Sequence, residues 1–335
     1  MSIGHTRVEA PPIQIAAGTA FALLVALAGA SREPREALTN ELGAALDEVG
    51  DTEGESWLNL LGIALDAGSP YGAKGLAEVV GLLDPVELRR HLLGRYAWSW
   101  CTLAGIDDIE AAAAGDAAAS ARLLQQPRYY AGHADTSLGV LLTLDPAETQ
   151  RRIIAAIDAA SRALLAATAP AALDAAEAAA SAALAAHSAL AAIERIATGY
   201  RYVPEPEAER VVLIPHLTPS LPLVLAQHRS SRLIAYRATA DRGSEERLLA
   251  LGRALADPKR VEILALVGRG VARAADLVDA TGLTRSTVHH HLAQLRDAGL
   301  VALEGNARAY TYVPRRAAAD DAAALVADII GTEGE

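Results

Sequence analysis

The most informative stretch of the chain lies between residues 257 and 301. It reads DPKRVEIL at 257–264, LTRSTVHHHL at 283–292 and LRDAGLV at 295–301. Helical spacing of the apolar residues predicts one helix from Pro258, a short turn, and a second helix from Thr284. Two short apolar runs follow and predict a pair of strands ending near Val313.

The predicted second helix has two chemically different faces. Thr284 is a good N-cap, and Gly282 supplies the tight turn before it. At about 100° per residue, one face collects Val288, Leu292, Leu295 and Gly299, with His291 at its margin. The other face carries Ser286, His290 and Ala293, flanked by Arg285, Thr287 and His289. This second face is small, hydroxylated and basic, and it suits close approach to base edges and phosphates.

Residues 300–304 and 309–313 are the predicted strands, and Gly305 to Arg308 form the turn between them. Helix, turn, helix and strand pair together are the layout of a winged helix-turn-helix, whose second helix lies in the DNA major groove. The residues expected to contact double-stranded DNA are Thr284, Arg285, Ser286, Thr287, His289, His290, Asn306 and Arg308. Two plainer readings stay open, a helical hairpin with a solvated face and an ordinary hairpin tip at Asn306 and Arg308.

These residues resemble the ArsR/SmtB family of bacterial winged-helix repressors. Asp257, Pro258, Arg260, Ile263 and Leu264 match the first part of the family pattern. Ser286, His290, His291, Leu292, Leu295, Arg296, Ala298, Gly299, Leu300 and Val301 match the second. The resemblance covers roughly residues 245–330. It implies a homodimer that binds an inverted-repeat operator and leaves it when an effector binds.

Metal sensing of the kinds common in that family is not expected. The single cysteine, Cys101, lies far from residues 245–330. The last predicted helix, near 317–330, carries Asp320, Asp321 and Asp328 but no histidine. Thiolate and zinc sites need several sulfurs or imidazoles. We therefore expect no metal and no cofactor, and we expect the last helix to pair with its twin in a dimer through Leu325, Val326, Ile329 and Ile330.

Charge is unevenly distributed along the chain. The formal net charge is −11, yet residues 245–316 hold eleven Lys/Arg against eight Asp/Glu. The remaining chain holds nineteen basic and thirty-three acidic residues. Basic charge thus sits where phosphate contacts are expected, and the large remainder should repel DNA. One cysteine excludes a disulfide framework and favours a cytoplasmic protein.

The apolar run from Ile13 to Ala30 raises the question of a membrane anchor. It barely reaches the length that spans hydrocarbon, and it contains Gln14, Thr19 and two glycines. It also lacks a basic leading region with a clear cleavage site. We expect a buried strand followed by a helix at the entry of a folded domain, with no membrane contact.

The fold class is expected to be mainly α. Helices are predicted after Asp84-Pro85, running on towards Cys101, after Asp145-Pro146, and from Pro170 to about Thr198. Short apolar runs at 200–203, 211–215, 223–225 and 233–236 predict a small antiparallel β element. The expected organisation is a helical sensor or dimerisation domain at 1–198, the β element and linker at 199–240, and the winged helix-turn-helix at 241–330.

Candidate sites in the first 240 residues carry weaker signals. Tyr96, Trp98 and Trp100 could line a ligand cavity, although core packing is the favoured reading. His133 with Asp135 is a weak catalytic pair beside the reading of a solvated loop. His216 and His228 could bind metal, but such histidines more often close a hydrogen bond. The chain has no G-x-S-x-G, Walker, G-x-G-x-x-G or H-E-x-x-H pattern.

The sequence therefore predicts a one-component transcription regulator, a repressor by resemblance, that is not an enzyme. A small organic, mostly apolar effector or a partner would act on the N-terminal domain. One alternative makes that domain a dimerisation or protein-interaction platform without a ligand. The other makes it an enzyme fused to a DNA-binding module, which clustered, buried titratable groups in a cleft would favour.

Overall fold

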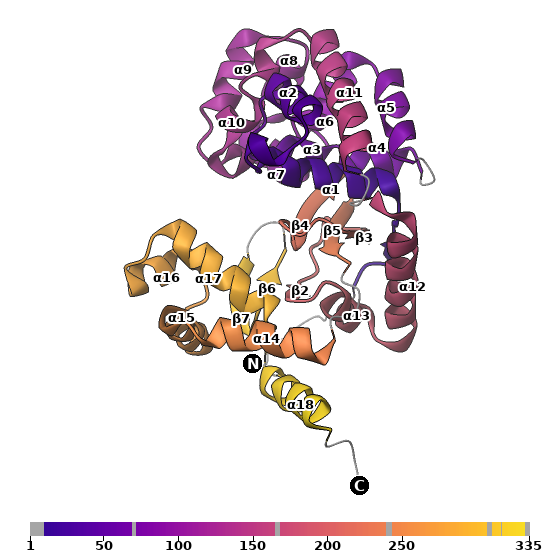
Figure 1. Ribbon diagram of the computed structural model, residues 1–335. Helices are drawn as coiled ribbons and strands as arrows, with labels where there is room; N and C mark the ends of the chain where they lie inside the picture. Colours follow the sequence, from indigo (N-terminus) through magenta and orange to yellow (C-terminus); the bar gives the residue numbers. More distant parts are fainter. Residues whose placement is uncertain are drawn as a thin grey trace, which may run out of the picture. The chain divides into compact units, whose positions relative to one another are not determined.

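The computed structural model describes residues 10–68, 72–164, 168–238, 243–306, 310–315 and 317–331. Their contacts divide the chain into two units, each described separately below (Figure 1). The N-terminal unit comprises Pro11–Ser181 and Pro206–Ala238. The C-terminal unit comprises Ala182–Glu205 and Thr239–Glu335, together with Met1–Ala10. The mainly α fold class is confirmed.

The N-terminal unit is a helical assembly around a small sheet. Its helices are α1 (Thr19–Ser31), α2 (Asn40–Val49), α3 (Glu55–Asn59), α4 (Leu61–Asp66), α5 (Ala73–Leu82), α6 (Pro85–Leu92), α7 (Trp98–Ala104), α8 (Ile106–Ala113), α9 (Ala117–Leu124), α10 (Ala134–Leu138), α11 (Pro146–Ala163) and most of α12 (Pro170–Ala186). Its strands are β1 (Ile13–Ile15), β3 (Arg210–His216), β4 (Leu223–His228) and β5 (Ser231–Arg237). Asp84 and Asp145 cap α6 and α11 with a proline in the first turn, as the sequence predicts.

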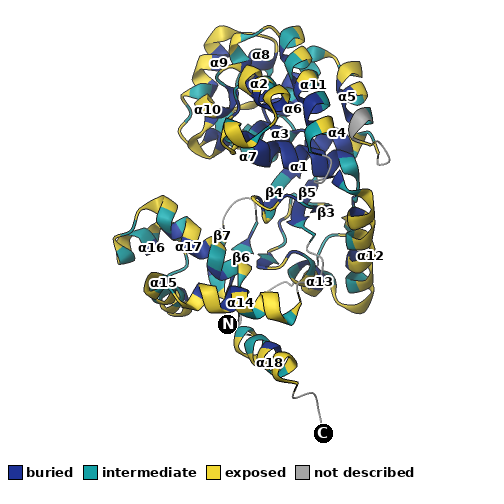
Figure 2. Cartoon of the chain, viewed as in Figure 1, coloured by how far each residue is buried: buried dark blue, intermediate teal, exposed yellow. Residues whose placement is uncertain are grey.

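Helix α1 is the centre of this unit. Twelve of its thirteen residues are buried, and Figure 2 shows it dark along its length. It packs against α3, α4, α5, α11 and strand β3. A helix that is apolar on all sides belongs in a protein core or a membrane. Together, β1 and α1 confirm the strand-then-helix prediction for residues 13–30. Within the described residues, no helix combines the length and apolar character needed to cross a membrane.

The expected antiparallel β element is wrong in its pairing. Four strands form one sheet in the order β1-β3-β5-β4, in which β1 and β5 lie parallel to β3 and only β4 is antiparallel to its neighbour. Six of the seven residues of β3 are buried, which is typical of a parallel strand covered on both faces. Strand β2 (Tyr200–Tyr202) does not join this sheet at all. Alternation of residue types identifies strands but does not select their partners.

Two predicted helices are each broken in the structure. The helix expected from Pro170 to Thr198 ends at Ala186, and α13 (Ala189–Ile196) begins after Ser188. The segment from Pro85 towards Cys101 is interrupted by residues 93–97, with Gly94 at positive φ. In both places tertiary packing outweighs a favourable local helix propensity. The long alanine-rich run consequently contributes to both units, since Ala182 begins a segment of the C-terminal unit.

The C-terminal unit contains the winged helix. Its elements are α13, β2, α14 (Ser244–Leu255), α15 (Pro258–Gly268), α16 (Ala274–Thr281), α17 (Arg285–Asp297), β6 (Val301–Gly305), β7 (Tyr310–Pro314) and α18 (Ala318–Ile330). Strands β6 and β7 pair antiparallel, as predicted, with Leu303 opposite Tyr312. Val288, Leu292 and Leu295 of α17 are fully buried, which confirms the predicted inner face. Helix α18 packs against α14 within the same chain.

The contact-based division differs from the expected one in a specific way. The segment 199–240 was expected to be one small β part between two domains. The structure instead assigns residues 199–205 to the C-terminal unit and Pro206–Ala238 to the N-terminal unit. The chain therefore passes between units more often than a linear reading of the sequence suggests.

Candidate nucleic-acid interface and other candidate sites

Asp257 and Arg260, at the start of α15, make hydrogen bonds that cap this helix and join it to α14. The Asp257 carboxylate caps α15 by accepting hydrogen bonds from the backbone N–H groups of Lys259 at 2.7 Å and Arg260 at 3.2 Å. Arg260 reaches back and donates to the carbonyl oxygens of Ala254 at 2.9 Å and Arg253 at 2.7 Å. Those carbonyls belong to the last turn of α14, where orphan acceptors attract cations. Asp257 and Arg260 thus join two helices and are not available as a DNA-contacting pair.

The turn into α17 follows the predicted chemistry. Gly282 adopts φ +67, a left-handed conformation that glycine accepts at low cost. The Thr284 hydroxyl accepts a hydrogen bond from the Thr287 backbone N–H at 3.2 Å, which confirms the predicted cap. The Thr284 Oγ1 atom also lies 3.0 Å from Ser286 Oγ and 2.7 Å from Thr287 Oγ1. These hydroxyls order one another at the start of the helix.

The outer face of α17 is open to solvent. Thr284, Arg285, Ser286 and His290 are exposed, and Thr287 and His289 are half-buried. The His290 Nε2 atom lies 3.0 Å from Gln294 Nε2, one turn further along the same face. Burial, together with the nearby charge of Arg285, lowers the pKa of His289. The exposed part of this face thus combines hydroxyl groups with the guanidinium of Arg285 and the imidazole of His290.

His291, the neighbour of His290 in sequence, lies on the inner face of α17 and has different surroundings. His291 is buried, with 8% of its surface exposed, and its Nδ1 atom has no hydrogen-bond partner among the described residues. It lies with Val288 and Leu295 on the inner face. Of the two expected wing residues, Asn306 is half-buried just after β6, and Arg308 lies outside the described residues.

The C-terminal end of α17 is closed by contacts within the unit. Gly299 has φ +72, and the carbonyl oxygen of Gly299 accepts a hydrogen bond from Arg315 Nη1 at 2.9 Å. Arg315 also pairs with Asp321 of α18 at 3.1 Å. This use of Asp321 is structural. In the part of the chain that the structure describes, no three His, Cys, Asp or Glu side chains are arranged to hold a metal ion.

The aromatic candidates of the N-terminal unit do not meet in one cavity. Trp100 stacks on Tyr130 at 5.6 Å between ring centroids and meets Tyr129 edge-on at 5.8 Å. Tyr96 lies instead against His91, at 4.6 Å. Trp98 is half-buried at the start of α7. Neither the trio nor any part of it lines the apolar hollow described next.

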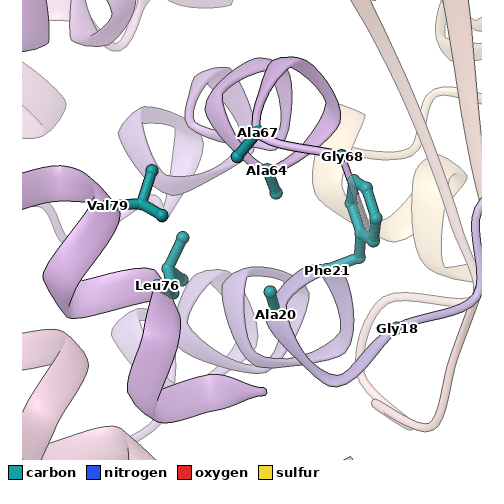
Figure 3. A pocket seen from close by; sticks show the side chains of 8 residues that line it. All are labelled: Gly18, Ala20, Phe21, Ala64, Ala67, Gly68, Leu76 and Val79. Atoms are coloured by element: carbon teal, nitrogen blue, oxygen red, sulfur yellow. The ribbon is translucent and has the colours of Figure 1, made fainter. Parts of the chain in front are cut away.

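A small hollow lies between α1, α4 and α5 (Figure 3). Its walls are Gly18, Ala20, Phe21, Ala64, Ala67, Gly68, Leu76 and Val79. Figure 3 shows the Ala20, Ala64, Leu76 and Val79 side chains directed toward a common space. The space holds about one water-sized group. An organic effector would need the surrounding helices to separate before it could enter.

A cluster of titratable groups joins the β4–β5 turn to α4 and α6, and the sequence did not predict it. His228 Nε2 lies 2.9 Å from Asp66 Oδ2, and the Arg229 guanidinium donates to the same oxygen at 3.1 Å. Arg229 also lies over the Tyr96 ring, 4.6 Å from its centroid. The Tyr96 hydroxyl donates a hydrogen bond to Glu87. These residues are separated by up to 163 positions in the chain, so no local motif could reveal them.

Burial and mutual pairing control the protonation of this cluster. Burial, helped by the neighbouring His228, lowers the pKa of His91 to about 4. Burial also lowers the pKa of His228, although the Asp66 carboxylate acts in the opposite direction. For Asp66, burial raises the pKa, but hydrogen bonds from His228 and Arg229 outweigh it and lower the pKa overall. Each carboxylate is thus already neutralised by a partner, as in a structural ion-pair network.

The remaining histidine candidates have ordinary structural surroundings. His216 is fully buried, and its Nδ1 atom accepts a hydrogen bond from the Thr218 backbone N–H at 3.2 Å. Both His216 and His228 therefore lie near hydrogen-bond partners. The side chain of His133 is 53% exposed, and its Nδ1 atom lies 3.9 Å from Glu53 Oε1; Asp135 is exposed beside it.

Comparison with known proteins identifies relatives of the C-terminal segment. The family described as "Bacterial regulatory protein, arsR family" matches residues 257–302. The HTH-type transcriptional regulator CmtR of Mycobacterium tuberculosis, and that of Mycobacterium bovis, are 46% identical over 68 residues, which cover 20% of this chain and 58% of the relative. The HTH-type transcriptional regulator YgaV of Escherichia coli is 37% identical over 70 residues, covering 21% of this chain and 71% of the relative.

No solved structure gives a significant match to the chain. The chain spans somewhat more than half the length of the CmtR relatives, and the matched region is confined to the winged-helix part. Its matched residues form the caps, turns and inner face that hold α15, α16 and α17 in place. The chain belongs to the ArsR family of bacterial regulatory proteins.

Proposed function

We propose that the protein is a one-component transcription regulator that binds operator DNA through α17 and the β6–β7 wing. The observation that carries this proposal is the division of α17 into a buried inner face and an open outer face. Arg285, Ser286 and His290 are exposed together, while Val288 and Leu292 on the other side are fully buried. A helix anchored in this way can place its outer side chains against base edges. The names of the relatives, both HTH-type transcriptional regulators, support the same function.

A symmetric dimer would present two such helices to an inverted repeat. Helices α14 and α18 pack together and leave apolar side chains exposed on the C-terminal unit. These are Leu249, Leu255, Val326, Ile329 and Ile330, with exposed fractions between 43% and 65%. Apolar side chains gathered on two packed helices favour burial against a second copy. Leu325, expected to face the twin, is instead buried at 8% exposure within the chain.

Repression and control by the N-terminal unit are further parts of the proposal. The family resemblance supports a repressor that leaves its operator when an effector binds, working in the cytoplasm. Ligand control requires different effector affinities in the two DNA-binding states. The hollow between α1, α4 and α5 admits only about one water-sized group as it stands. An organic effector that used this hollow would bind to a state in which these helices have moved apart. Tyr96, Trp98 and Trp100 do not line the hollow and would belong to a separate effector site.

The burial of α1 among α3, α4, α5, α11 and β3 also favours a second candidate for the N-terminal unit. In this alternative the unit is a dimerisation or protein-interaction platform without a small ligand. The titratable cluster around Asp66 and His228 lies apart from the hollow between α1, α4 and α5, whereas the enzyme alternative expects such groups in a cleft. Thermal denaturation with a set of apolar metabolites distinguishes the candidates. Stabilisation by a metabolite together with release of DNA supports an effector. The absence of both responses supports a platform.

DNA binding itself is tested by selection. The full-length protein is incubated with a random pool of 30-bp duplexes at low ionic strength, and retained sequences are amplified over several rounds. We expect enrichment of an inverted repeat whose half-sites are about one helical turn apart. The selected duplex should be retarded in a gel and should be protected from cleavage over both half-sites. Failure to enrich any sequence, or absence of duplex binding at low salt, would overturn the proposal.

A further inference from the structure

The wing has a third strand that comes from outside the winged helix. Strand β2 pairs parallel to β6, with Tyr200 opposite Leu303 and Tyr202 opposite Gly305 (Figure 1). The Leu303 backbone N–H donates to the Gly199 carbonyl at 2.8 Å, and the Val203 N–H donates to the Gly305 carbonyl at 3.0 Å. The edge of β6 would otherwise present unpaired backbone groups. We refer to residues Gly199–Val203 as the wing strap.

Side chains fasten the strap as well as the backbone. Arg201 Nη1 lies 2.8 Å from Glu304 Oε2 on β6, and Arg201 Nη2 lies 3.4 Å from Glu194 Oε1 on α13. The Tyr200 hydroxyl donates to the Gly305 carbonyl at 2.9 Å. Gly305 is the last residue of β6, immediately before the turn that carries the expected wing contacts. The strap therefore contacts β6 up to its last residue, just before the turn of the wing.

The strap also contacts the end of the recognition helix. Gly199 has φ +81, and a Cβ atom at this position would overlap the side chain of Arg296. Arg296 lies in the last turn of α17, and burial lowers its pKa. Only glycine combines this backbone conformation with so close an approach. The same short segment thus meets both parts of the unit that we propose to contact DNA.

The chain reaches the strap from the N-terminal unit and returns to that unit after it. Pro11–Ser181 and Pro206–Ala238 belong to the N-terminal unit, while Ala182–Glu205 belong to the C-terminal unit. A change in the N-terminal unit can therefore act on the strap through covalent connections at both of its ends.

We propose that the wing strap positions the wing and the end of α17 for DNA binding, and that Arg201 is a positioning residue in it. The proposal rests on the proposed DNA-binding function. Arg201 need not touch DNA; it acts by holding β6 through Glu304. By this route the N-terminal unit controls the DNA affinity of the winged helix.

The test uses charge exchange in the full-length protein. Arg201→Glu faces Glu304 and Glu194 with a like charge, and we expect about tenfold weaker binding to the selected 30-bp duplex. Protection should be lost at the positions covered by the wing and kept at those covered by α17. Adding Glu304→Arg to Arg201→Glu restores an opposite pair and should recover most of the affinity. Arg201→Lys should bind within about threefold of the unmodified protein.

The matched control is Arg195→Glu, because Arg195 is an exposed arginine on α13 close to the strap in sequence. This control should leave the duplex affinity and the footprint unchanged. An unchanged affinity in Arg201→Glu, or no recovery in the exchanged pair, would overturn the positioning role. A uniform loss of protection over the whole site would also overturn it, because that result indicates general destabilisation.

Amide hydrogen exchange of the protein without DNA provides an independent readout. Arg201→Glu should speed exchange in β6 and β7, and the exchanged pair should restore protection, while α1 stays protected in all variants. If the unmodified protein binds no duplex, the proposed function fails, yet this exchange measurement still decides whether the strap holds the wing. Unaltered amide exchange in β6 of Arg201→Glu would contradict the proposal that the strap holds the wing.

Discussion

Helices α1 and α17 have the same length, thirteen residues each, and opposite surroundings. In α1 twelve residues are buried, whereas in α17 only Val288, His291, Leu292 and Leu295 are. The first helix is apolar around its whole circumference, and the second repeats apolar residues on one side only. Because its inner face is buried and its outer face is polar and exposed, α17 is available to a partner, whereas α1 is not. Changes in α1 should therefore act on stability, and changes on the outer face of α17 should act on binding.

The largest effect is expected in α1. Leu24→Ala removes a fully buried side chain and leaves a cavity, so the free energy of unfolding should fall by about 2–5 kcal/mol. Urea denaturation followed by circular dichroism measures this change. Ala293→Ser, on the exposed face of α17, is the matched control and should change stability by less than about 0.5 kcal/mol. Equal stability changes in the two variants would contradict the contrast.

The buried histidines of the N-terminal unit make its stability depend on pH. Burial lowers the pKa of His216 to about 3 and that of His91 to about 4, whereas the unfolded chain has values near 6.5. The unfolded state then binds more protons, so stability is full above about pH 6.5 and falls as the pH drops towards 4. Each of the two residues should lower the free energy of unfolding by on the order of 3 kcal/mol over this range.

Urea midpoints at pH 7 and pH 4.5 measure this loss. The double variant His91→Leu/His216→Leu should lose less stability on acidification than the unmodified protein. A variant whose midpoint falls by the same amount would show that other groups cause the acid sensitivity. His290→Ala, on the exposed face of α17, is the control and should lose as much stability on acidification as the unmodified protein.

On α17, Arg285→Ala and His290→Ala should each weaken binding to the selected duplex by about 1–3 kcal/mol if they read bases, and should relax the preference at single positions. The melting temperatures of these variants should stay close to that of the unmodified protein. His291→Ala is the contrasting variant, since His291 is buried and its loss should act mainly on stability. Unchanged footprints for both exposed variants would reject their assignment as base contacts.

Substitutions at Thr284 test how much the N-cap of α17 contributes to stability. Thr284→Ala removes the acceptor for the Thr287 N–H and should cost about 1 kcal/mol of stability. Thr284→Ser keeps the hydroxyl and should lose much less. The comparison of their urea midpoints measures the cap; if the two variants behave alike, the hydroxyl is not the stabilising group.

The smallest expected effect concerns the wing tip. Arg308→Ala should lower affinity similarly for all duplex sequences and reduce the salt dependence of binding by about one phosphate contact. Retardation assays across a range of salt concentrations measure the slope. A slope equal to that of the unmodified protein would remove Arg308 from the interface.

The prediction from sequence was most accurate where local signals decide structure. The cap at Thr284, the turn at Gly282 and the buried set Val288, Leu292 and Leu295 follow from residue types and helical period. It was less accurate for pairing over long distances. Residues 200–202 read correctly as a strand, but their partner, β6, lies about 100 positions away. The cluster of Asp66 with His228 was missed for the same reason.

The family, the mainly α composition and the polar face of the recognition helix can be inferred from the amino-acid sequence, because caps, turns and helical period are properties of neighbouring residues. Only the tertiary structure decided which strand covers the wing, where the alanine-rich helix breaks, and which charged groups meet in the N-terminal unit. Those outcomes depend on how distant segments bury surface and satisfy backbone groups together, and short-range patterns carry no information about such partners.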